Sequence, residues 1–420
     1  MNTGWIGRLA IRDFRNLSRV EIEPPGEGFV LVGDNGEGKT NFLEAIQYLQ
    51  ILRSFRGALD RELVSFGKPG FHLAAELGGA TVHKISVGFA RAGRRKKATL
   101  DGVEPPRLSG ALGSFPAVVF SPQDVALVSG APSVRRRFLD VVLSLTSPTY
   151  LTALQRYRAA LVRRNAALRE GTPTGAARAL RAAANRARSG AAAAATDAAA
   201  DAAANGAPGQ VGRSAASVED RIAVWEPALA EYGAVLWRER SRWVESNTDE
   251  YRELCLAIGE RGTPAMRYAG GGDEADLESA LRAALERKRP LDVRRGLTHV
   301  GPHRDDLALL LDDHDLRTFG SAGQQRTAAM ALRLLEAATL RAHAGREPVV
   351  LLDDPFAELD ARRSARILEL LDAGRRGQTI LAVPRESDIP EGLTRLSRWR
   401  IAAGIITPGV AATGTGVGRT

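Results

Sequence analysis

The segment GDNGEGKT, at positions 33–40, constrains the fold more than any other part of the sequence. It follows the apolar run GFVLV, which predicts a buried strand ending at Val32, and it precedes a stretch with Phe42, Ile46 and Leu49 at helical spacing. A Gly-rich turn ending in Gly-Lys-Thr between a strand and a helix is typical of a phosphate-binding loop. The segment therefore predicts an α/β fold that holds a nucleotide at the start of this helix.

Each residue type in the loop has a chemical reason to be there. Glycines allow backbone N–H groups to converge on phosphate oxygens, Lys39 can reach the β and γ phosphates, and the Thr40 hydroxyl can coordinate magnesium. A Gly-rich turn without a ligand is the alternative, and the strand and helix on either side disfavour it. The expected nucleotide-binding residues are Gly33, Asp34, Asn35, Gly36, Glu37, Gly38, Lys39, Thr40 and Asn41.

A second acidic signal lies near the other end of the chain. The run VVLLDD, at positions 349–354, predicts a buried strand that ends in two carboxylates. In nucleotidases with a phosphate loop, the first carboxylate, here Asp353, holds magnesium through water, and the second, Asp354, can orient the attacking water. A buried strand with a solvated acidic tip is the alternative. If both motifs serve one site, that site is assembled from the two ends of the chain.

The segment FGSAGQQRT, at positions 319–327, predicts a helix start without a lysine. It resembles the signature motif of ABC-type ATPases, in which the signature of one subunit contacts the γ phosphate bound by the other. Ser321, Gly323 and Gln324 would then serve a partner's ATP through polar groups and the helix dipole. This resemblance implies a head-to-tail homodimer with ATP in its interface.

Further positions follow from the same class. Gln123 lies near the place of the Q-loop, and AELD, at positions 357–360, follows the acidic strand as a D-loop would, with Asp360 as its acid. The alternative for AELD is a helix N-terminal turn. Val383 and Pro384 stand where many ABC ATPases carry a switch histidine, which leaves the γ-phosphate sensor unassigned and indicates slow hydrolysis.

The rest of the chain suggests an ATPase head interrupted by a helical region. We expect an ATPase lobe over 1–131 with antiparallel hairpins, a helical arm over 132–298, a second ATPase segment over 299–405 and a tail over 406–420. One helix of the arm should end before Pro290. Residues 171–217 are rich in Ala and Gly and predict a disordered insertion, although Ala also favours a helix.

Composition adds limits on the environment and the partners. The net charge of +9 and the pI near 10.1 favour polyanionic partners such as nucleic acid or an acidic membrane. No apolar run is long enough to span a bilayer, and the first residues lack the layout of a signal peptide, so we expect a cytoplasmic protein. The single cysteine, Cys255, permits no internal disulfide and is expected to be buried.

With these motifs in place, the chain resembles the RecF family, recombination-repair ATPases of the ABC class related to the heads of SMC and Rad50 proteins. The resemblance covers most of the chain outside the Ala-rich segment. It rests on RDFRN at 12–16, RSFRG at 53–57, FSPQDVALVSGAPSVRRRFLD at 120–140, RYRAALVRRNAAL at 156–168, GPHRDDL at 301–307 and GSAGQQRTAAMAL at 320–332.

The resemblance implies a weak, DNA-dependent ATPase that uses ATP and Mg²⁺ and clamps duplex DNA as an ATP-bound dimer. It further implies a preference for junctions of duplex and single strand, and cooperation with RecR and RecO to load RecA at gaps. Basic stretches that could contact DNA backbone contain Arg94, Arg95, Lys96 and Lys97, and Arg135 and Arg136. Each stretch is equally compatible with a solvated face.

Three alternatives belong to other classes. ATP could serve only to hold a regulatory DNA-binding dimer together, with vestigial hydrolysis. A transporter ATPase would leave GPHRDDL and the helical arm unexplained. An SMC-like long coiled coil is excluded, because the region between Pro132 and Pro290 is too short and lacks sustained heptads.

The reading of the Ala-rich segment as an insertion can be tested by deletion. We expect removal of residues 171–217 to leave nucleotide affinity unchanged, because none of the site motifs lies there. Equilibrium binding of a fluorescent ATP analogue to the deleted and full-length chains measures this. Loss of the nucleotide site in the deletion would show that the segment is a structural part of the fold.

Overall fold

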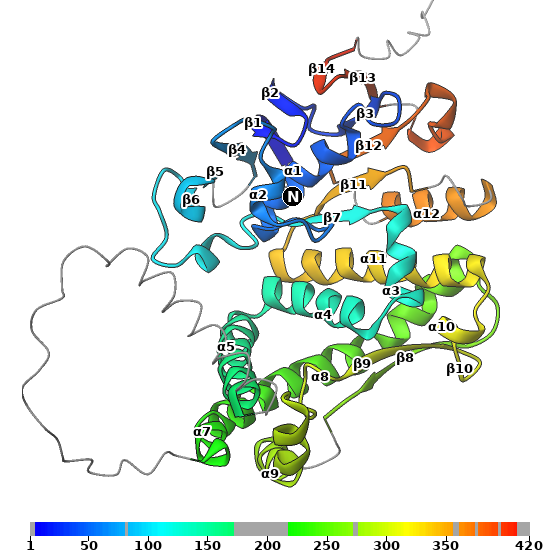
Figure 1. Ribbon diagram of the computed structural model, residues 1–420. Coiled ribbons are helices and arrows are strands. Elements are labelled where there is room, and N and C mark those ends of the chain that lie inside the picture. Colours follow the sequence, from blue (N-terminus) through cyan, green and yellow to red (C-terminus); the bar gives the residue numbers. More distant parts are fainter. Residues whose placement is uncertain are drawn as a thin grey trace, which may run out of the picture. The chain divides into compact units, whose positions relative to one another are not determined.

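The computed structural model describes residues 5–79, 83–171, 217–271, 276–355, 361–373, 377–393 and 396–409 (Figure 1). The chain divides into two compact units: Met1–Ser147, Val244–Arg267 and Leu307–Thr420 form the first, and Pro148–Trp243 and Tyr268–Asp306 form the second. Helices and strands alternate in the first unit, so the mixed α/β fold expected from the sequence is confirmed. The domain limits proposed above at 132 and 298 remain a prediction.

One layer of the first unit is an antiparallel sheet with the order β2-β1-β4-β5-β6. The hairpins predicted in the first lobe are therefore confirmed. Apolar and polar residues alternate along β4 and β5, as expected when one face of a sheet is buried. The strands are β1 (Trp5–Phe14), β2 (Leu17–Ile22), β4 (Gly70–Gly78), β5 (Lys84–Ala90) and β6 (Arg95–Leu100).

The second sheet of this unit combines strands from both ends of the chain. Its order is β14-β13-β3-β12-β11-β7, and every pair except β13 with β14 is parallel. These strands are short apolar runs, as expected when both faces of a parallel sheet are covered. They are β3 (Gly28–Val32), β7 (Ala117–Phe120), β11 (Val349–Asp353), β12 (Thr379–Val383), β13 (Ser397–Ala402) and β14 (Ile405–Thr407).

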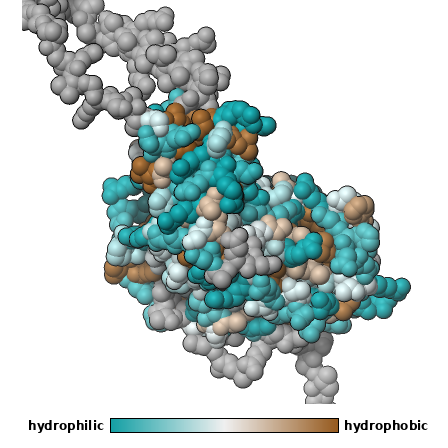
Figure 2. Space-filling view, turned by 90° about the horizontal axis from the view of Figure 1, so that it is seen from below, coloured by the Kyte–Doolittle hydropathy of each residue, from teal (hydrophilic) through white to brown (hydrophobic). Residues whose placement is uncertain are grey.

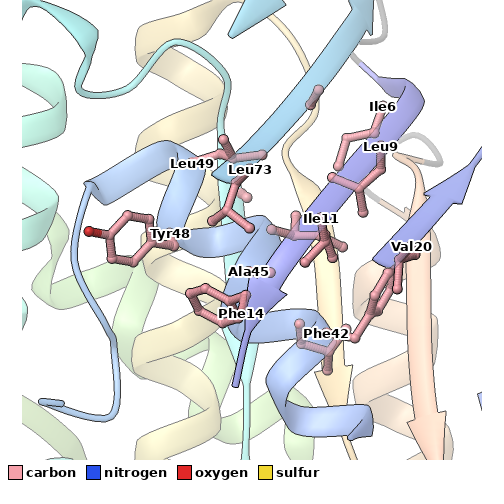
Figure 3. Close-up of a cluster of buried hydrophobic side chains, with 14 of the residues drawn as sticks. Ile6, Leu9, Ile11, Phe14, Val20, Phe42, Ala45, Tyr48, Leu49 and Leu73 are labelled. Carbon is pink, nitrogen blue, oxygen red and sulfur yellow. The ribbon is translucent and has the colours of Figure 1, made fainter. Parts of the chain in front are cut away.

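Helix α1 (Lys39–Ile51) contacts strands of both sheets, and the main hydrophobic core surrounds it. Figure 3 shows Phe42, Tyr48 and Leu49 of α1 together with Ile11 and Phe14 of β1 in this core. The rings of Phe14 and Tyr48 meet edge to face, with centroids 6.0 Å apart. The helix that follows the phosphate loop is thus fixed by the core along its whole length.

Apart from the end of α8 (Glu226–Ile258), the remaining helices of the first unit lie in two stretches of the chain, one up to Ser147 and one from Leu307 onward. The helix predicted to begin at the signature segment is α11, and Ser321 is its N-cap. The helices in these stretches are α2 (Asp60–Leu63), η1 (Ala92–Arg94), η2 (Leu108–Ala111), η3 (Pro122–Val125), α3 (Ala126–Ser129), α4 (Pro132–Thr146), α10 (Leu316–Phe319), α11 (Ala322–Ala344), α12 (Ala361–Ala373), η4 (Glu386–Asp388) and η5 (Glu391–Leu393).

The second unit is largely helical. A small sheet of β8 (Pro264–Ala269), β9 (Asp306–Leu311) and β10 (His314–Asp315) belongs mostly to the first unit, whereas the second unit contains α5 (Pro148–Gly171), α7 (Val218–Ala223), the first part of α8 (Glu226–Ile258) and α9 (Leu277–Arg295). Two polar networks in the second unit are buried. One contains Arg164 of the RYRAALVRRNAAL segment, and the other contains residues of the GPHRDDL segment.

The first network surrounds Arg164, whose side chain is fully buried. Its guanidinium donates to Asp292 Oδ2 and to Thr298 Oγ1, both at 2.8 Å, and to Glu226 Oε1 at 2.9 Å. His299 Nδ1 lies 2.7 Å from the other carboxylate oxygen of Asp292. A buried arginine is tolerated here because every charge in the network has a partner.

This network also explains a wrong expectation about α9. The sequence predicted that the helix would end before Pro290, but it continues to Arg295 and ends at Gly296 in the left-handed conformation. The turn after the proline contains Asp292, whose buried carboxylate binds Arg164. These tertiary contacts outweigh the hydrogen bond that a proline removes from a helix.

The second network uses the GPHRDDL segment. The Tyr157 hydroxyl lies 2.7 Å from His303 Nδ1, while Asp305 Oδ2 accepts from Trp237 Nε1 at 2.5 Å and from the Tyr268 hydroxyl at 2.6 Å. Gly301 has a φ of 121°, and a Cβ there would lie 2.5 Å from the Tyr157 hydroxyl oxygen. This segment therefore holds the second unit together from inside.

The surface is mostly hydrophilic on the face that Figure 2 shows, with small hydrophobic patches. No helix in the described parts of the chain is long and apolar enough to span a membrane. Cys255, in α8, is buried as expected, and burial raises the pKa of its thiol to about 12.

The Arg164 network gives a prediction about stability. Replacing Arg164 by Met leaves the buried Glu226 and Asp292 carboxylates short of a partner, and losing one member of a buried ion pair costs about 3–5 kcal/mol. We therefore expect the urea midpoint of Arg164→Met to fall clearly below that of the wild type. Arg163→Met is the matched control, because Arg163 is exposed and stacks on Trp225 at 5.1 Å. Equal midpoints for the two variants would contradict the prediction.

Candidate nucleotide-binding site

The phosphate loop connects β3 to α1 and has the backbone shape that its glycines permit. Gly38 has a φ of 113°, and a Cβ at this position would lie 2.7 Å from the side chain of Asn16. The ammonium of Lys39 donates to the carbonyl oxygens of Gly33 at 2.5 Å and Asp34 at 2.9 Å. Burial lowers the pKa of Lys39, although nearby carboxylates, first among them Asp353, oppose this shift.

The two ends of the chain meet at Thr40 and Asp353. The Thr40 hydroxyl lies 2.9 Å and 3.0 Å from the two carboxylate oxygens of Asp353, which ends β11. Burial raises the pKa of Asp353, while the hydrogen bond from Thr40 lowers it. A hydroxyl and a carboxylate side by side are hard oxygen donors, the type that Mg²⁺ prefers. The residues present therefore fit a magnesium ion.

Asp354 takes an unusual backbone conformation beside this pair. Its φ is 47°, in the left-handed region that Asp adopts more readily than most residues. Its N–H donates to the carbonyl of Ala382 in β12 at 2.9 Å. Burial raises the pKa of its carboxyl, and the Asp388 carboxylate adds to the increase. The sharp turn places a second acid at the carboxyl end of the strand.

One open pocket collects residues from three distant segments. The η3 turn contributes Gln123, so the possible Q-loop residue lies at the same pocket as the phosphate loop and both acids. Its lining residues are Asn35, Gly36, Gly38, Lys39, Thr40, Asn41, Arg56, Ser121, Pro122, Gln123, Asp353 and Asp354. Lys39, an expected ligand, and Arg56 supply positive charge for an anionic group.

Arg56, Arg15 and Asn16 were not among the expected site residues. Asn16 Nδ2 donates to the Glu37 carbonyl at 3.0 Å, and Asn16 Oδ1 accepts from Asn41 at 2.9 Å, so it braces the phosphate loop. Arg56 donates to Asn41 Oδ1 at 3.2 Å. The sequence did contain a signal, because these residues belong to the RDFRN and RSFRG segments.

A buried carboxylate holds the RDFRN and RSFRG segments, which contact the phosphate loop. Glu44 of α1 is fully buried and accepts from Arg15 Nε at 3.0 Å, and the Ser54 hydroxyl also donates to it. Glu44 lies on the face of α1 toward the RSFRG loop, where Arg56 is 3.8 Å away. A central acid thus ties the two arginine-containing segments to the helix that follows the phosphate loop.

The signature segment forms a capped helix start at the surface. The Ser321 Oγ accepts from the Gln324 N–H at 3.3 Å, and the Gln324 side chain accepts from the Ser321 N–H at 2.9 Å. No acidic residue lies in the first turn of α11, so the positive end of its dipole is not neutralised locally. Ser321, Gly323 and Gln324 do not line the pocket described above, within the described part of the same chain.

A buried ion network links the Gln123 turn to the signature helix. Arg333 of α11 donates to Asp124 Oδ1 and to Glu336 Oε2, both at 2.6 Å. Asp124 Oδ2 in turn accepts from the Ser121 N–H at 2.7 Å. Burial raises the pKa of Glu336 despite the nearby guanidinium. Movement of η3 at the pocket must therefore be accommodated by α11.

The expected DNA contacts divide into two groups. Arg94, Arg95 and Lys97 are exposed, although Lys97 pairs with Glu104 at 2.8 Å. Lys96 instead points inward, where it binds Asp60 at 2.7 Å and the Leu52 carbonyl at 2.8 Å, so its assignment as a DNA contact is corrected.

Arg135 requires the same correction. Its side chain is 3% exposed and donates to the Val128 and Gly130 carbonyls, both at 3.0 Å, which closes the end of α3. In the sequence this arginine lies in a basic stretch that could contact DNA backbone, but its guanidinium instead binds carbonyls at the end of the preceding helix. Arg136 is partly exposed. Asp360 and the D-loop lie outside the described residues.

Comparisons with known proteins agree with the architecture. No family model matches the chain. The DNA replication and repair protein RecF of Salinibacter ruber is 32% identical over 395 residues, covering 92% of this chain and 86% of that protein. RecF of Gloeobacter violaceus is 34% identical over 411 residues, covering 96% of each.

Solved structures extend the comparison to the fold. A recombination mediator protein RecF bound to ATP, from the RecFOR pathway, superposes with a TM-score of 0.78 at 26% identity, covering 97% of this chain and 98% of the other. An SMC head domain from Pyrococcus furiosus shares the fold, with a TM-score of 0.50 at 14% identity over 96% of this chain and 95% of that one. The expected fold, an ABC-type ATPase head, is confirmed. Since the curated relatives share 32% and 34% of aligned residues with it over most of their length, the chain belongs to the RecF family of DNA replication and repair proteins.

Proposed function

We propose that this protein is an ATP-dependent DNA-binding clamp of recombinational and replication-gap repair, with slow, DNA-dependent ATP hydrolysis. The observation that carries the proposal is the pocket where Lys39, Thr40, Gln123, Asp353 and Asp354 converge from distant parts of the chain. A phosphate loop, two strand-end acids and a glutamine are the groups that phosphoryl transfer to water requires. The relative bound to ATP supports the choice of nucleotide.

The expected ligands divide between phosphates and metal. Backbone N–H groups of the loop and the Lys39 ammonium bind the β and γ phosphates, and Thr40 and Asp353 hold Mg²⁺. The ion, when bound, neutralises charge on the phosphate oxygens. The Thr40 hydroxyl and the Asp353 carboxylate already lie in hydrogen-bonding contact, so the residues that would hold the ion are together before it binds.

In hydrolysis, Asp354 orients the attacking water. Lys39 stabilises the charge on the transferred phosphoryl group. The left-handed turn at Asp354 directs the second acid to the same pocket. Gln123 stands where it could report the γ phosphate to α11 through Asp124 and Arg333. Val383 and Pro384 provide no switch histidine, in keeping with slow turnover.

The clamp is proposed to be a head-to-tail homodimer. The Ser321 turn is exposed and carries no acid, so the start of α11 suits the γ phosphate of an ATP held by a second copy. Arg94, Arg95, Lys97 and Arg136 remain candidates for backbone contacts with duplex DNA and with junctions of duplex and single strand. Cytoplasmic location, cooperation with RecR and RecO in loading RecA, and a part in the SOS response complete the proposal.

A second candidate follows from the missing switch histidine. ATP could act only as a ligand that joins two subunits, with hydrolysis vestigial. Linkage makes this feasible, because a ligand at 100 times its dissociation constant stabilises the state that binds it by about 2.7 kcal/mol per site. The two candidates differ in whether the Asp354 carboxylate acts on the nucleotide.

Replacing Asp354 by Asn distinguishes a hydrolysing clamp from a dimer in which ATP acts only as a ligand. The amide keeps the size of the side chain but removes the negative charge that orients water, so we expect hydrolysis to fall by about 100-fold or more. ATP-dependent dimers should persist or become longer-lived. Steady-state phosphate release with duplex DNA measures turnover, and solution mass measures the dimer. An unchanged hydrolysis rate with persistent dimers would reject the enzyme and favour the second candidate.

The dimer itself is tested by molecular mass in solution, with and without ATP and Mg²⁺, and again with gapped duplex DNA. We expect ATP to drive dimerisation, DNA binding to follow it, and Ser321→Arg to abolish both by placing bulk and charge at the trans contact. Ser217→Arg is the matched control, because Ser217 is also an exposed N-cap with a reciprocal capping bond to Asp220. Monomers with bound ATP, or equal DNA binding without ATP, would contradict the clamp.

A further inference from the structure

An exposed aromatic side chain lies beside the signature segment. Phe319 is 71% exposed and precedes Ser321 by two residues. Its ring meets the His314 ring edge to face, with centroids 5.9 Å apart and planes at 84°. A large apolar ring left in solvent next to a proposed contact with a second subunit suggests an interaction site.

The ring is held in a defined position. Phe319 ends α10, a single turn anchored by the buried Leu316 and capped by Asp315, which accepts from the Arg317 N–H at 2.7 Å. The Gln325 side chain of α11 donates to the Leu316 carbonyl at 2.9 Å. The second glutamine of the signature thus fixes the turn that carries Phe319, so little conformational freedom is lost if the ring binds.

A complementary surface adjoins the phosphate loop. A second pocket shares Asn41 with the phosphate pocket, so the two pockets adjoin, and we name it the nucleoside pocket for the role proposed below. Phe66 at this pocket is 99% exposed and offers one aromatic face. The lining residues are Arg15, Asn16, Asn41, Arg61, Glu62, Val64, Phe66, Arg91 and Arg94.

Charge distinguishes the two surfaces. The turn before Phe319 contains the exposed Asp312, Asp313 and Asp315, with Arg317 as the nearest charge of opposite sign along the chain. The pocket near the phosphate loop has more arginines than acids. An acidic turn and a basic pocket attract one another when a second copy approaches head to tail.

We propose that Phe319 of one subunit closes the nucleoside pocket of its partner. The base of ATP then lies between the partner's Phe66 and the Phe319 ring. The inference rests on the proposed ATP-bound dimer and adds a part of the site that one chain cannot supply alone. Phe319 binds the base side of the nucleotide, whereas Ser321 serves its phosphates. Base stacking on an aromatic ring tolerates any base and needs no hydrogen-bonding partner.

The test compares wild type, Phe319→Ala, Phe319→Tyr and Val224→Ala. Val224 is the matched control, because it is 70% exposed and belongs to the second unit, whereas the signature belongs to the first. The ATP concentration for half-maximal dimerisation is measured by solution mass, with Mg²⁺ and without DNA. We expect this concentration to rise by about tenfold or more in Phe319→Ala and to stay near the wild-type value in Phe319→Tyr and Val224→Ala.

Inorganic tripolyphosphate provides a readout that a purely structural role would not move. It carries the phosphates without a base, so the wild type should dimerise less readily with it than with ATP. In Phe319→Ala this preference for ATP over tripolyphosphate should shrink, because the ring that contacts the base is gone. Binding of ATP to dilute monomers of both proteins should be equal, since Phe319 contacts only the partner's nucleotide.

The outcomes separate this inference from the proposed function. If wild type does not dimerise with ATP, the dimer proposal fails and Phe319 with it. If wild type dimerises and Phe319→Ala matches it in both ATP concentration and preference over tripolyphosphate, the dimer stands and the role of Phe319 is wrong. Loss of monomer ATP binding in Phe319→Ala would place the ring in its own subunit's site and also overturn the inference.

Discussion

The nucleotide site depends on the parallel pairing of strands from opposite ends of the chain. β3 leads into the phosphate loop and lies between β12 and β13, while β11 pairs with β12 on the other side. This order brings Thr40, at the start of α1, within 3.0 Å of Asp353, at the end of β11. Ligands of α/β proteins gather at the carboxyl ends of such strands, and here the pairing assembles a site that neither end contains alone.

Local patterns predicted the parts of this site whose structure is set by nearby residues. The strand, loop and helix at 28–51 form as expected, because their backbone bonds and glycine requirements are local, and Ser321 caps its helix for the same reason. Features set by distant partners were missed. Asn16 braces a loop more than 20 residues away, as its contact with Glu37 shows, and α9 continues past Pro290 because Asp292 binds Arg164.

Some of the chain's positive charge lies on buried arginines and not on its surface. Arg135, Arg164 and Arg240 are each no more than 3% exposed and serve as internal connections among carbonyls, carboxylates and hydroxyls. A guanidinium suits this role because it donates several hydrogen bonds in one plane and stays charged. The net charge of +9 counts these residues equally with those on the surface, and it counts buried acids such as Glu44 and Glu336 in the same way, so it is not the charge that a polyanion meets. Sequence alone cannot separate the two groups, because both occur on amphipathic helices.

The burial of Cys255 affects how readily the protein's sulfur atoms are oxidised. With a thiol pKa of about 12, almost none of it is thiolate at neutral pH, and the thiolate is the form that oxidants attack. Met266 and Met330 are also buried, at 5% and 4% exposure. In the described parts of the chain, then, peroxide meets no accessible sulfur. Oxidation of sulfur is therefore a slow route to damage in the part of this protein that the structure describes.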